Sequence, residues 1–280
     1  MPRFINPHEV RPMSFVALVS SILKNYELIF QMTKREVVGR YKGSILGIAW
    51  SFFNPILMLT IYTFVFSVVF KSRWGSTGAD SKAEFALILF VGMIIYGFFA
   101  ETINGSPGLI LSNVNYVKKV VFPLEILSIV SCSVALFHAA ISFSVLLVAL
   151  LILSGGLNWT VLFLPLVIMP LLCLILGLSW FLAALGVYVR DIGQTIGILT
   201  TLLLFLSPVF YPISAVPPQF QFWILLNPLS FVIGQARDIL IFGVPPDWFW
   251  LGIYFMLSTI VMLLGFAWFQ KTRKGFADVL

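Results

Sequence analysis

Three basic residues, Arg35, Arg40 and Lys42, lie close together shortly before the first long apolar run of the sequence. Guanidinium and ammonium groups form charge-assisted hydrogen bonds with phosphate oxygens, and a guanidinium can bind two oxygens at once. These residues are therefore candidates for binding a phosphate or diphosphate group. They would equally attract anionic lipid headgroups, each contributing about 1 kcal/mol. The sequence leaves the two interpretations open.

Motifs for nucleotide hydrolysis and for hydrolytic catalysis are absent from the sequence. No Gly-Lys pair occurs, so the chain has no phosphate-binding P-loop and is not itself an ATPase. It has no His-Glu-x-x-His or Gly-x-Ser-x-Gly sequence either. Its two cysteines, Cys132 and Cys173, lie in apolar runs and are interpreted as small core residues. We expect no metal and no cofactor in this chain.

Two ionisable residues fall inside apolar runs, where an unpaired charge is costly. Glu101 is expected near the cytoplasmic end of its run, hydrogen-bonded or exposed to water, in a pathway or a structural role. His138 has serines nearby and is interpreted as a buried, hydrogen-bonded core residue, with a proton relay as the alternative.

The composition indicates that membrane helices position these residues. Hydrophobic residues make up 60% of the 280-residue chain, charged residues make up 10%, and the mean hydropathy is +1.04. A soluble domain could not cover itself with so little polar surface, whereas a bilayer core requires this composition. We predict an all-α polytopic membrane protein that forms a single domain over 1–280. Apolar runs predict six transmembrane helices, at 48–70, 85–107, 126–153, 161–188, 194–211 and 248–269.

Two further segments are apolar but are not predicted to cross the bilayer. Residues 14–43 repeat apolar side chains at three- and four-residue steps, which is typical of an amphipathic helix on the membrane surface. Gly39, Gly43 and Gly47 are spaced four apart and would let this helix approach a neighbour closely. Residues 212–247 are interrupted by prolines into halves too short to cross, so we predict a re-entrant helical hairpin between spans five and six.

The distribution of basic residues predicts the orientation. Most of the 17 lysines and arginines fall in 1–47, in the loops after spans two and four, and in the C-terminal tail. The positive-inside rule therefore places both termini in the cytoplasm. The opposite side carries the remaining basic residues, Lys71, Arg73, Lys82 and Arg237. The net charge of +6 follows from this orientation and does not indicate nucleic-acid binding.

The cytoplasmic loop at 111–125 contains Lys118 and Lys119 followed by Phe122-Pro123-Leu124-Glu125. A proline in a first helical turn and a glutamate near its positive end favour a short helix that lies flat and docks into a groove of a partner. An ordinary positively charged loop explains these residues equally well.

Four motifs in order along the chain resemble those of ABC-2 type polysaccharide exporter permeases. The resemblance covers nearly the whole chain, and four ordered motifs are far more specific than any one of them. The motifs are Lys34-Arg35-Glu36 with Arg40-Tyr41, Ser44, Leu46-Gly47, Trp50 and Pro55; Val117-Lys118-Lys119-Val120-x-Phe122-Pro123-x-Glu125; Arg190-Asp191-Ile192-x-Gln194; and Ser207-Pro208-x-x-Tyr211-Pro212 with Asn227-Pro228. Ser128 departs from the pattern, because many relatives carry a proline there.

The resemblance implies a non-catalytic subunit that exports a lipid-linked polysaccharide of the O-antigen type across the bacterial inner membrane. Such permeases form homodimers and bind two cytoplasmic ATPase subunits, which hold ATP and magnesium. Closure of the ATPases would rotate the coupling helices and open the dimer seam. The implied ATPase contacts are Lys118, Lys119, Phe122, Pro123 and Glu125 in a coupling helix, with Arg190 and Asp191 in a smaller contact. The implied periplasmic gate residues are Pro208, Tyr211, Pro212, Asn227 and Pro228.

A polysaccharide path needs surfaces along which sugar rings can slide. Aromatic side chains stack on the apolar faces of sugars without binding one sugar tightly. Arg35, Arg40 and Lys42 would receive the diphosphate of the lipid carrier. The candidate lining comprises Tyr62, Phe66 and Phe70, which share a helix face, and the cluster Tyr96, Phe98 and Phe99. Core or lipid-facing packing is the alternative for each of them.

Other functions are distinguishable in principle. Teichoic-acid, capsule or drug export would use the same family architecture. An ion-coupled secondary transporter would show midplane ionisable residues and an inverted repeat, but the sequence offers only His138 and Glu101. A membrane enzyme would need a carboxylate or histidine constellation at one surface, and the acidic residues here are scattered singly.

Overall fold

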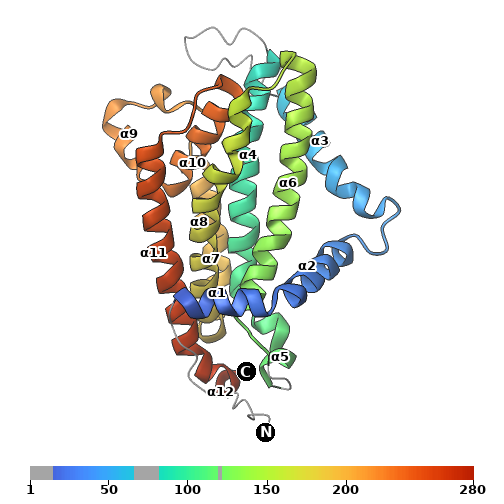
Figure 1. Ribbon diagram of the computed structural model, residues 1–280, viewed down its shortest axis with the longest axis vertical. Helices are drawn as coiled ribbons and strands as arrows, with labels where there is room; N and C mark the ends of the chain where they lie inside the picture. Colours follow the sequence, from blue (N-terminus) through green and yellow to red (C-terminus); the bar gives the residue numbers. More distant parts are fainter. Residues whose placement is uncertain (1–14, 66–81, 119–121) are drawn as a thin grey trace.

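The computed structural model describes residues 15–65, 82–118 and 122–280, and all regular structure in these ranges is helical. Helices satisfy the backbone hydrogen bonds that lipid cannot. The α-helices are α1 (Phe15–Lys24), α2 (Tyr26–Arg40), α3 (Trp50–Tyr62), α4 (Lys82–Gly105), α5 (Val114–Lys118), α6 (Ile126–Ser154), α7 (Leu164–Tyr188), α8 (Ile192–Leu206), α9 (Pro218–Leu225), α10 (Pro228–Arg237), α11 (Trp248–Thr272) and α12 (Phe276–Val279). The long helices stand side by side in one bundle (Figure 1).

The prediction of an all-α protein with long membrane helices is confirmed. Among the described residues, five helical stretches are long and apolar enough to cross a membrane. These stretches are Gly47–Val65, Glu84–Gly108, Ile126–Leu153, Trp159–Tyr188 and Trp248–Val279. The end of the first predicted span, at 66–70, lies outside the described residues.

The predicted fifth span, 194–211, is too long. The helix α8 ends at Leu206 and has 15 residues, so it is roughly 22 Å long, less than the hydrocarbon core of about 30 Å. Ser207 takes an extended conformation (ψ 148°) because the ring of Pro208 disfavours the helical conformation in the residue before it.

The predicted hairpin after this helix is present as two short helices. The segments Pro218–Leu225 and Pro228–Phe242 meet at a 95° bend. Asn227 caps the second, since its Oδ1 accepts from the Leu229 amide at 3.0 Å while its Nδ2 donates to Ser207 Oγ at 2.8 Å. These bonds join the bend to the end of α8.

Arg237, which the charge count placed in a loop, is buried with 5% of its surface exposed. Its guanidinium donates to the carbonyl oxygens of Ile88 (3.0 Å), Pro208 (2.6 Å) and Val209 (2.9 Å). The side chain therefore joins α10 to α4 and to the segment after α8 instead of facing water, and the side of the membrane assigned to Arg237 stays a prediction.

The prediction of a surface helix at 14–43 is wrong in one respect, since it expected a single helix. The segment forms two helices, α1 and α2, which meet at an angle at Asn25 (Figure 1). The side-chain amide of Asn25 donates from Nδ2 to the Ser21 carbonyl at 2.7 Å. Asparagine side chains compete in this way with helical hydrogen bonds. After α2 the chain turns back toward α3 through Gly43 and Gly47, which have φ values of 87° and 53°.

Close glycine packing occurs elsewhere than predicted. Within the described part of the chain, no atom beyond the immediate neighbours lies within 4 Å of a Cβ built at Gly39, Gly43 or Gly47. The close approach is between α7 and α11, where a Cβ at Gly265 would collide with the backbone of Gly177. Small residues let membrane helices approach at backbone distance, and these two helices form the most extensive pair in the bundle.

Candidate functional site

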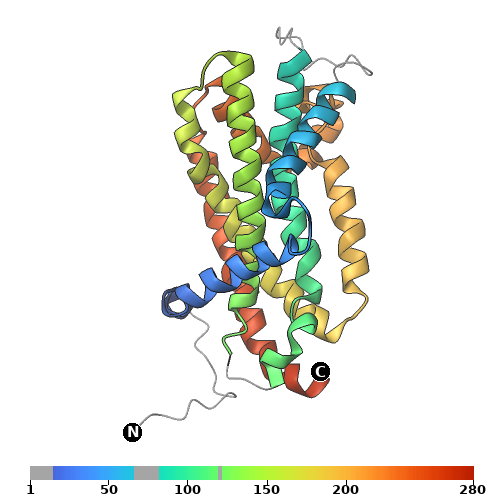
Figure 2. The ribbon, with the colours of Figure 1, turned by 90° about the vertical axis from the view of Figure 1, so that its right-hand side faces the viewer.

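A cavity of about 280 Å³ opens between α3, α4 and α6. Its wall is mostly apolar and aromatic, and one end carries a carboxylate and an imidazole. The lining residues include Pro55, Met58 and Tyr62 of α3, Phe90, Phe98 and Glu101 of α4, and Ala135, His138 and Ser142 of α6. The helix α3 lies at one side of the bundle in Figure 1 and therefore in front of it in Figure 2, and many of its apolar side chains are exposed.

Glu101 and His138 form the charged end of this cavity, and outside its lining they bind Arg40 and Tyr41 to make a polar cluster of four residues. The Glu101 carboxylate accepts from Arg40 at 2.5 Å and lies 2.9 Å from His138 Nδ1. The Tyr41 hydroxyl lies 3.2 Å from His138 Nε2. Burial raises the pKa of Tyr41, so its hydroxyl stays protonated and available as a donor.

Both residues are hydrogen-bonded, as expected for His138 and as one of the two expectations for Glu101, but His138 is only partly buried and not the buried core residue predicted. Their pairing with each other and with Arg40 was missed. The three residues come from α4, α6 and the end of α2, far apart in the chain. One signal was available: ionisable groups inside membrane spans usually pair with one another.

The candidate aromatic residues do not form one surface. Tyr62 and Phe98 line the cavity, whereas Phe99 is buried with 3% exposure outside its lining. Tyr96 donates its hydroxyl to the Thr200 carbonyl of α8 at 2.9 Å. Successive positions on a helix are rotated by about 100°, so neighbouring residues cannot all face one cavity. Phe66 and Phe70 lie outside the described residues.

The three basic candidates are also separated. Arg40 belongs to the polar cluster, Lys42 is exposed in the turn after α2, and Arg35 contacts Tyr116 Oη at 3.4 Å. Of the three, only Arg40 therefore pairs with a residue that lines the cavity, Glu101.

The loop between α5 and α6 differs from the predicted helix over Lys118–Glu125. Its helix is α5, which ends at Lys118, and Pro123–Glu125 form a turn that leads into α6. Lys119 lies outside the described residues. Phe122 stacks on Tyr116 of α5 with ring centroids 4.3 Å apart and is itself buried. Only 1% of the Glu125 surface is exposed, so Glu125 is not a surface contact.

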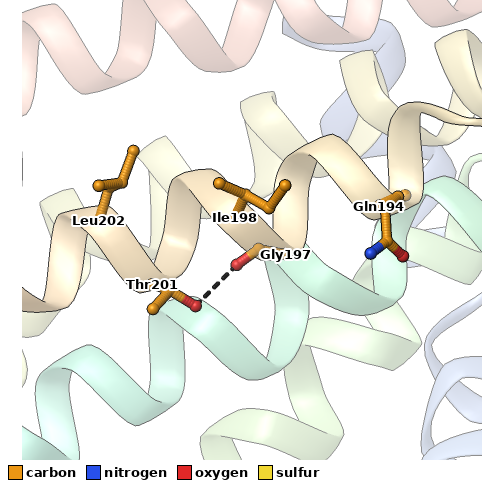
Figure 3. Close-up of a pocket in the computed structure, with 6 residues that line it drawn as sticks. Gln194, Gly197, Ile198, Thr201 and Leu202 are labelled. Carbon is orange, nitrogen blue, oxygen red and sulfur yellow. Dashed lines mark hydrogen bonds between the residues drawn. The ribbon is translucent and has the colours of Figure 1, made fainter.

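The second predicted contact, Arg190 and Asp191, is exposed in the turn between α7 and α8. Beyond it, a shallow surface groove follows α8, lined by residues that include Gln194, Gly197, Ile198 and Leu202 (Figure 3). Thr201, also in the groove, donates its hydroxyl back to Gly197 O at 2.9 Å. Gln194 and Thr201 are the polar residues of this groove, and the others are glycines or apolar residues.

The candidate gate residues lie along the connection from α8 to α10. Pro208 is buried and its carbonyl binds Arg237, while the Tyr211 hydroxyl folds back to Phe205 O at 2.9 Å. Pro212 follows Tyr211 directly, and Asn227 and Pro228 form the start of α10. Asn227 bonds to Ser207, the residue before Pro208, and Arg237 of α10, the helix that Asn227 caps, bonds to the Pro208 carbonyl. These bonds hold Pro208 and Asn227 close together.

These features define a helical multi-pass membrane protein with a partly exposed polar cluster between α2, α4 and α6. The chain belongs to the ABC-2 type transporter family, whose sequence profile matches residues 27–241. It is similar to the O-antigen export system permease protein RfbA of Myxococcus xanthus, with 26% identity over 94% of this chain and 99% of the relative. RfbA of Klebsiella pneumoniae is 25% identical over 91% of this chain and 95% of the relative. The polysialic acid transport protein KpsM of Escherichia coli is 24% identical over 86% of this chain and 92% of the relative.

Proposed function

We propose that this chain is the permease subunit of an ABC transporter that exports a lipid-linked polysaccharide of the O-antigen type across the bacterial inner membrane. The cavity between α3, α4 and α6 carries the proposal, because it joins a wall that contains aromatic residues to a polar end whose carboxylate is paired with Arg40. Arg40, with Lys42 nearby, would meet the carrier diphosphate, and Tyr62 and Phe98 would contact sugar rings. Similarity to O-antigen and polysialic acid transport proteins over most of the chain favours a glycan over a drug or a teichoic acid.

The proposed assembly is a homodimer of this chain with two cytoplasmic ATPase subunits that bind ATP and magnesium. The helix α5, the turn at 190–191 and the C-terminus lie toward the same end of the bundle (Figure 1), which supports one cytoplasmic face for all three. Both termini would then be cytoplasmic. The hairpin at 212–247 would lie on the periplasmic side, and Pro208, Tyr211, Pro212, Asn227 and Pro228 would frame the exit.

Reconstitution tests this function. The chain, purified with its ATPase, would be placed in lipid vesicles with a lipid-linked polysaccharide, and the protected polymer would be measured. Export should require ATP and persist after the ion gradients are collapsed. Export without ATP that follows an ion gradient would contradict the proposal and favour a secondary transporter.

Replacing Tyr62 with alanine should lower export severalfold while the amount of assembled protein stays near that of the wild type. The change removes an aromatic surface from the cavity wall, and one aromatic–sugar contact contributes about 1 kcal/mol, by analogy with aromatic pairs. Phe64→Ala is the matched control, because Phe64 is 58% exposed and does not line the cavity. Equal export by the two variants would remove Tyr62 from the path.

A further inference from the structure

Glu125 occupies a node where distant parts of the chain meet on the side of the bundle that holds α5. Its carboxylate accepts from Ser21 Oγ of α1 at 2.9 Å and pairs with Arg273, just after α11, at 2.9 Å. Its backbone carbonyl accepts from Trp180 Nε1 of α7, also at 2.9 Å. The Arg273 guanidinium further donates to Phe122 O at 2.8 Å.

The node also reaches the loop that the proposed ATPase would contact. Phe122, whose carbonyl Arg273 holds, stacks its ring on Tyr116 of α5. A displacement of α5 would therefore be passed through Phe122 to the segment that carries Glu125.

The burial of Glu125 makes these links stiff. The residue is 1% exposed and the Arg273 side chain is 17% exposed, so water cannot easily replace either partner. Hydrogen bonds to buried charges are short and strong, and breaking one side of a buried pair is strongly unfavourable. The turn before α6, the start of the surface helices and the C-terminal segment should then move together.

The hydrogen bond from Ser21 of α1 to Glu125 connects this node to the cavity along the chain. The helix α1 precedes α2, whose last residue, Arg40, pairs with Glu101 at the cavity end. A movement of α1 would reach Arg40 through α2. Glu125 thus lies between the exposed loop and the residues that we place in the substrate path.

We propose that Glu125 is a positioning residue that transmits the movement of the ATPase-contacting loop to the surface helix α1, using Ser21 as the receiving group. The inference rests on the proposed function, because it requires an ATPase at that loop. It differs from a direct contact role, because only 1% of the Glu125 side chain is exposed.

The sharpest test uses Ser21→Ala. This change removes one hydrogen bond, while Arg273 still pairs with the carboxylate, so folding should be preserved. The purified complex with its ATPase would be assayed in vesicles for ATP hydrolysis and for polysaccharide exported per ATP. We expect hydrolysis close to that of the wild type and export per ATP roughly tenfold lower, the size of one charged hydrogen bond. Ser21→Thr keeps the hydroxyl and should restore export per ATP.

Ser144→Ala is the matched control, because Ser144 of α6 is exposed and its hydroxyl binds only the Ala140 carbonyl of its own helix among the hydrogen bonds seen. Glu125→Gln provides a second variant that keeps the size of the side chain and removes its charge, and its export per ATP should also fall. If both variants lowered only the yield or melting temperature of the complex, with export per ATP unchanged, Glu125 would be a structural staple and the inference would be overturned. Failure of the wild-type complex to export with ATP would instead overturn the proposed function.

Discussion

Replacing Gly265 with alanine should destabilise the protein strongly, although alanine is the better helix former. A Cβ at this position would overlap the backbone of Gly177, including its carbonyl oxygen and Cα. No rotamer change relieves a clash with backbone, so α7 and α11 would have to separate. Overpacking in a well-packed core typically costs about 1–3 kcal/mol, and backbone contacts lie at the upper end. The measurement is the melting temperature and the yield of the detergent-purified chain.

Gly252→Ala in the same helix is the control with the opposite expected sign. Nothing lies within 4 Å of a Cβ built there. Alanine should therefore leave stability unchanged or raise it by up to about 1 kcal/mol through helix propensity. A melting temperature for Gly265→Ala that is equal to that of Gly252→Ala would show that the two helices do not approach as described.

Replacing Glu101 with glutamine should abolish most export while leaving a folded protein. The neutral amide cannot balance Arg40, and it offers His138 a weaker partner than the carboxylate. Loss of charge-assisted hydrogen bonds of this kind costs about 1.5–3 kcal/mol, which corresponds to roughly a tenfold or greater loss if the cluster positions the substrate. The measurements are export in reconstituted vesicles and the melting temperature of the purified chain.

Glu27→Gln is the matched control, since Glu27 in α2 is exposed and accepts only from the Tyr26 hydroxyl among the hydrogen bonds seen. A double-mutant cycle of Glu101→Gln with Arg40→Gln separates the pair from its surroundings. If the two residues act as a pair, the double variant should lose much less than the sum of the single losses. Additive losses, or full export by Glu101→Gln, would contradict the role assigned to the cluster.

The sequence by itself determined the class of fold and most helix positions. Long apolar runs can satisfy their backbone only as helices in a bilayer, so composition and periodicity were enough to predict α4, α6, α7 and α11. Prolines and the Asn227-Pro228 pair likewise predicted the bent hairpin, because their effects on the backbone are local. The four family motifs, also linear features, led to the correct family.

Only the tertiary structure decided which of these helices meet. It paired Glu101 with His138 and Arg40, buried Glu125 against Arg273 and Ser21, and placed Arg237 among three backbone carbonyls. Local patterns fix the face on which a side chain lies, but not the helix that covers that face. A charge near a helix end therefore has the same sequence signature whether water, lipid or a distant ion partner surrounds it, and here the packing of helices far apart in the chain made the choice.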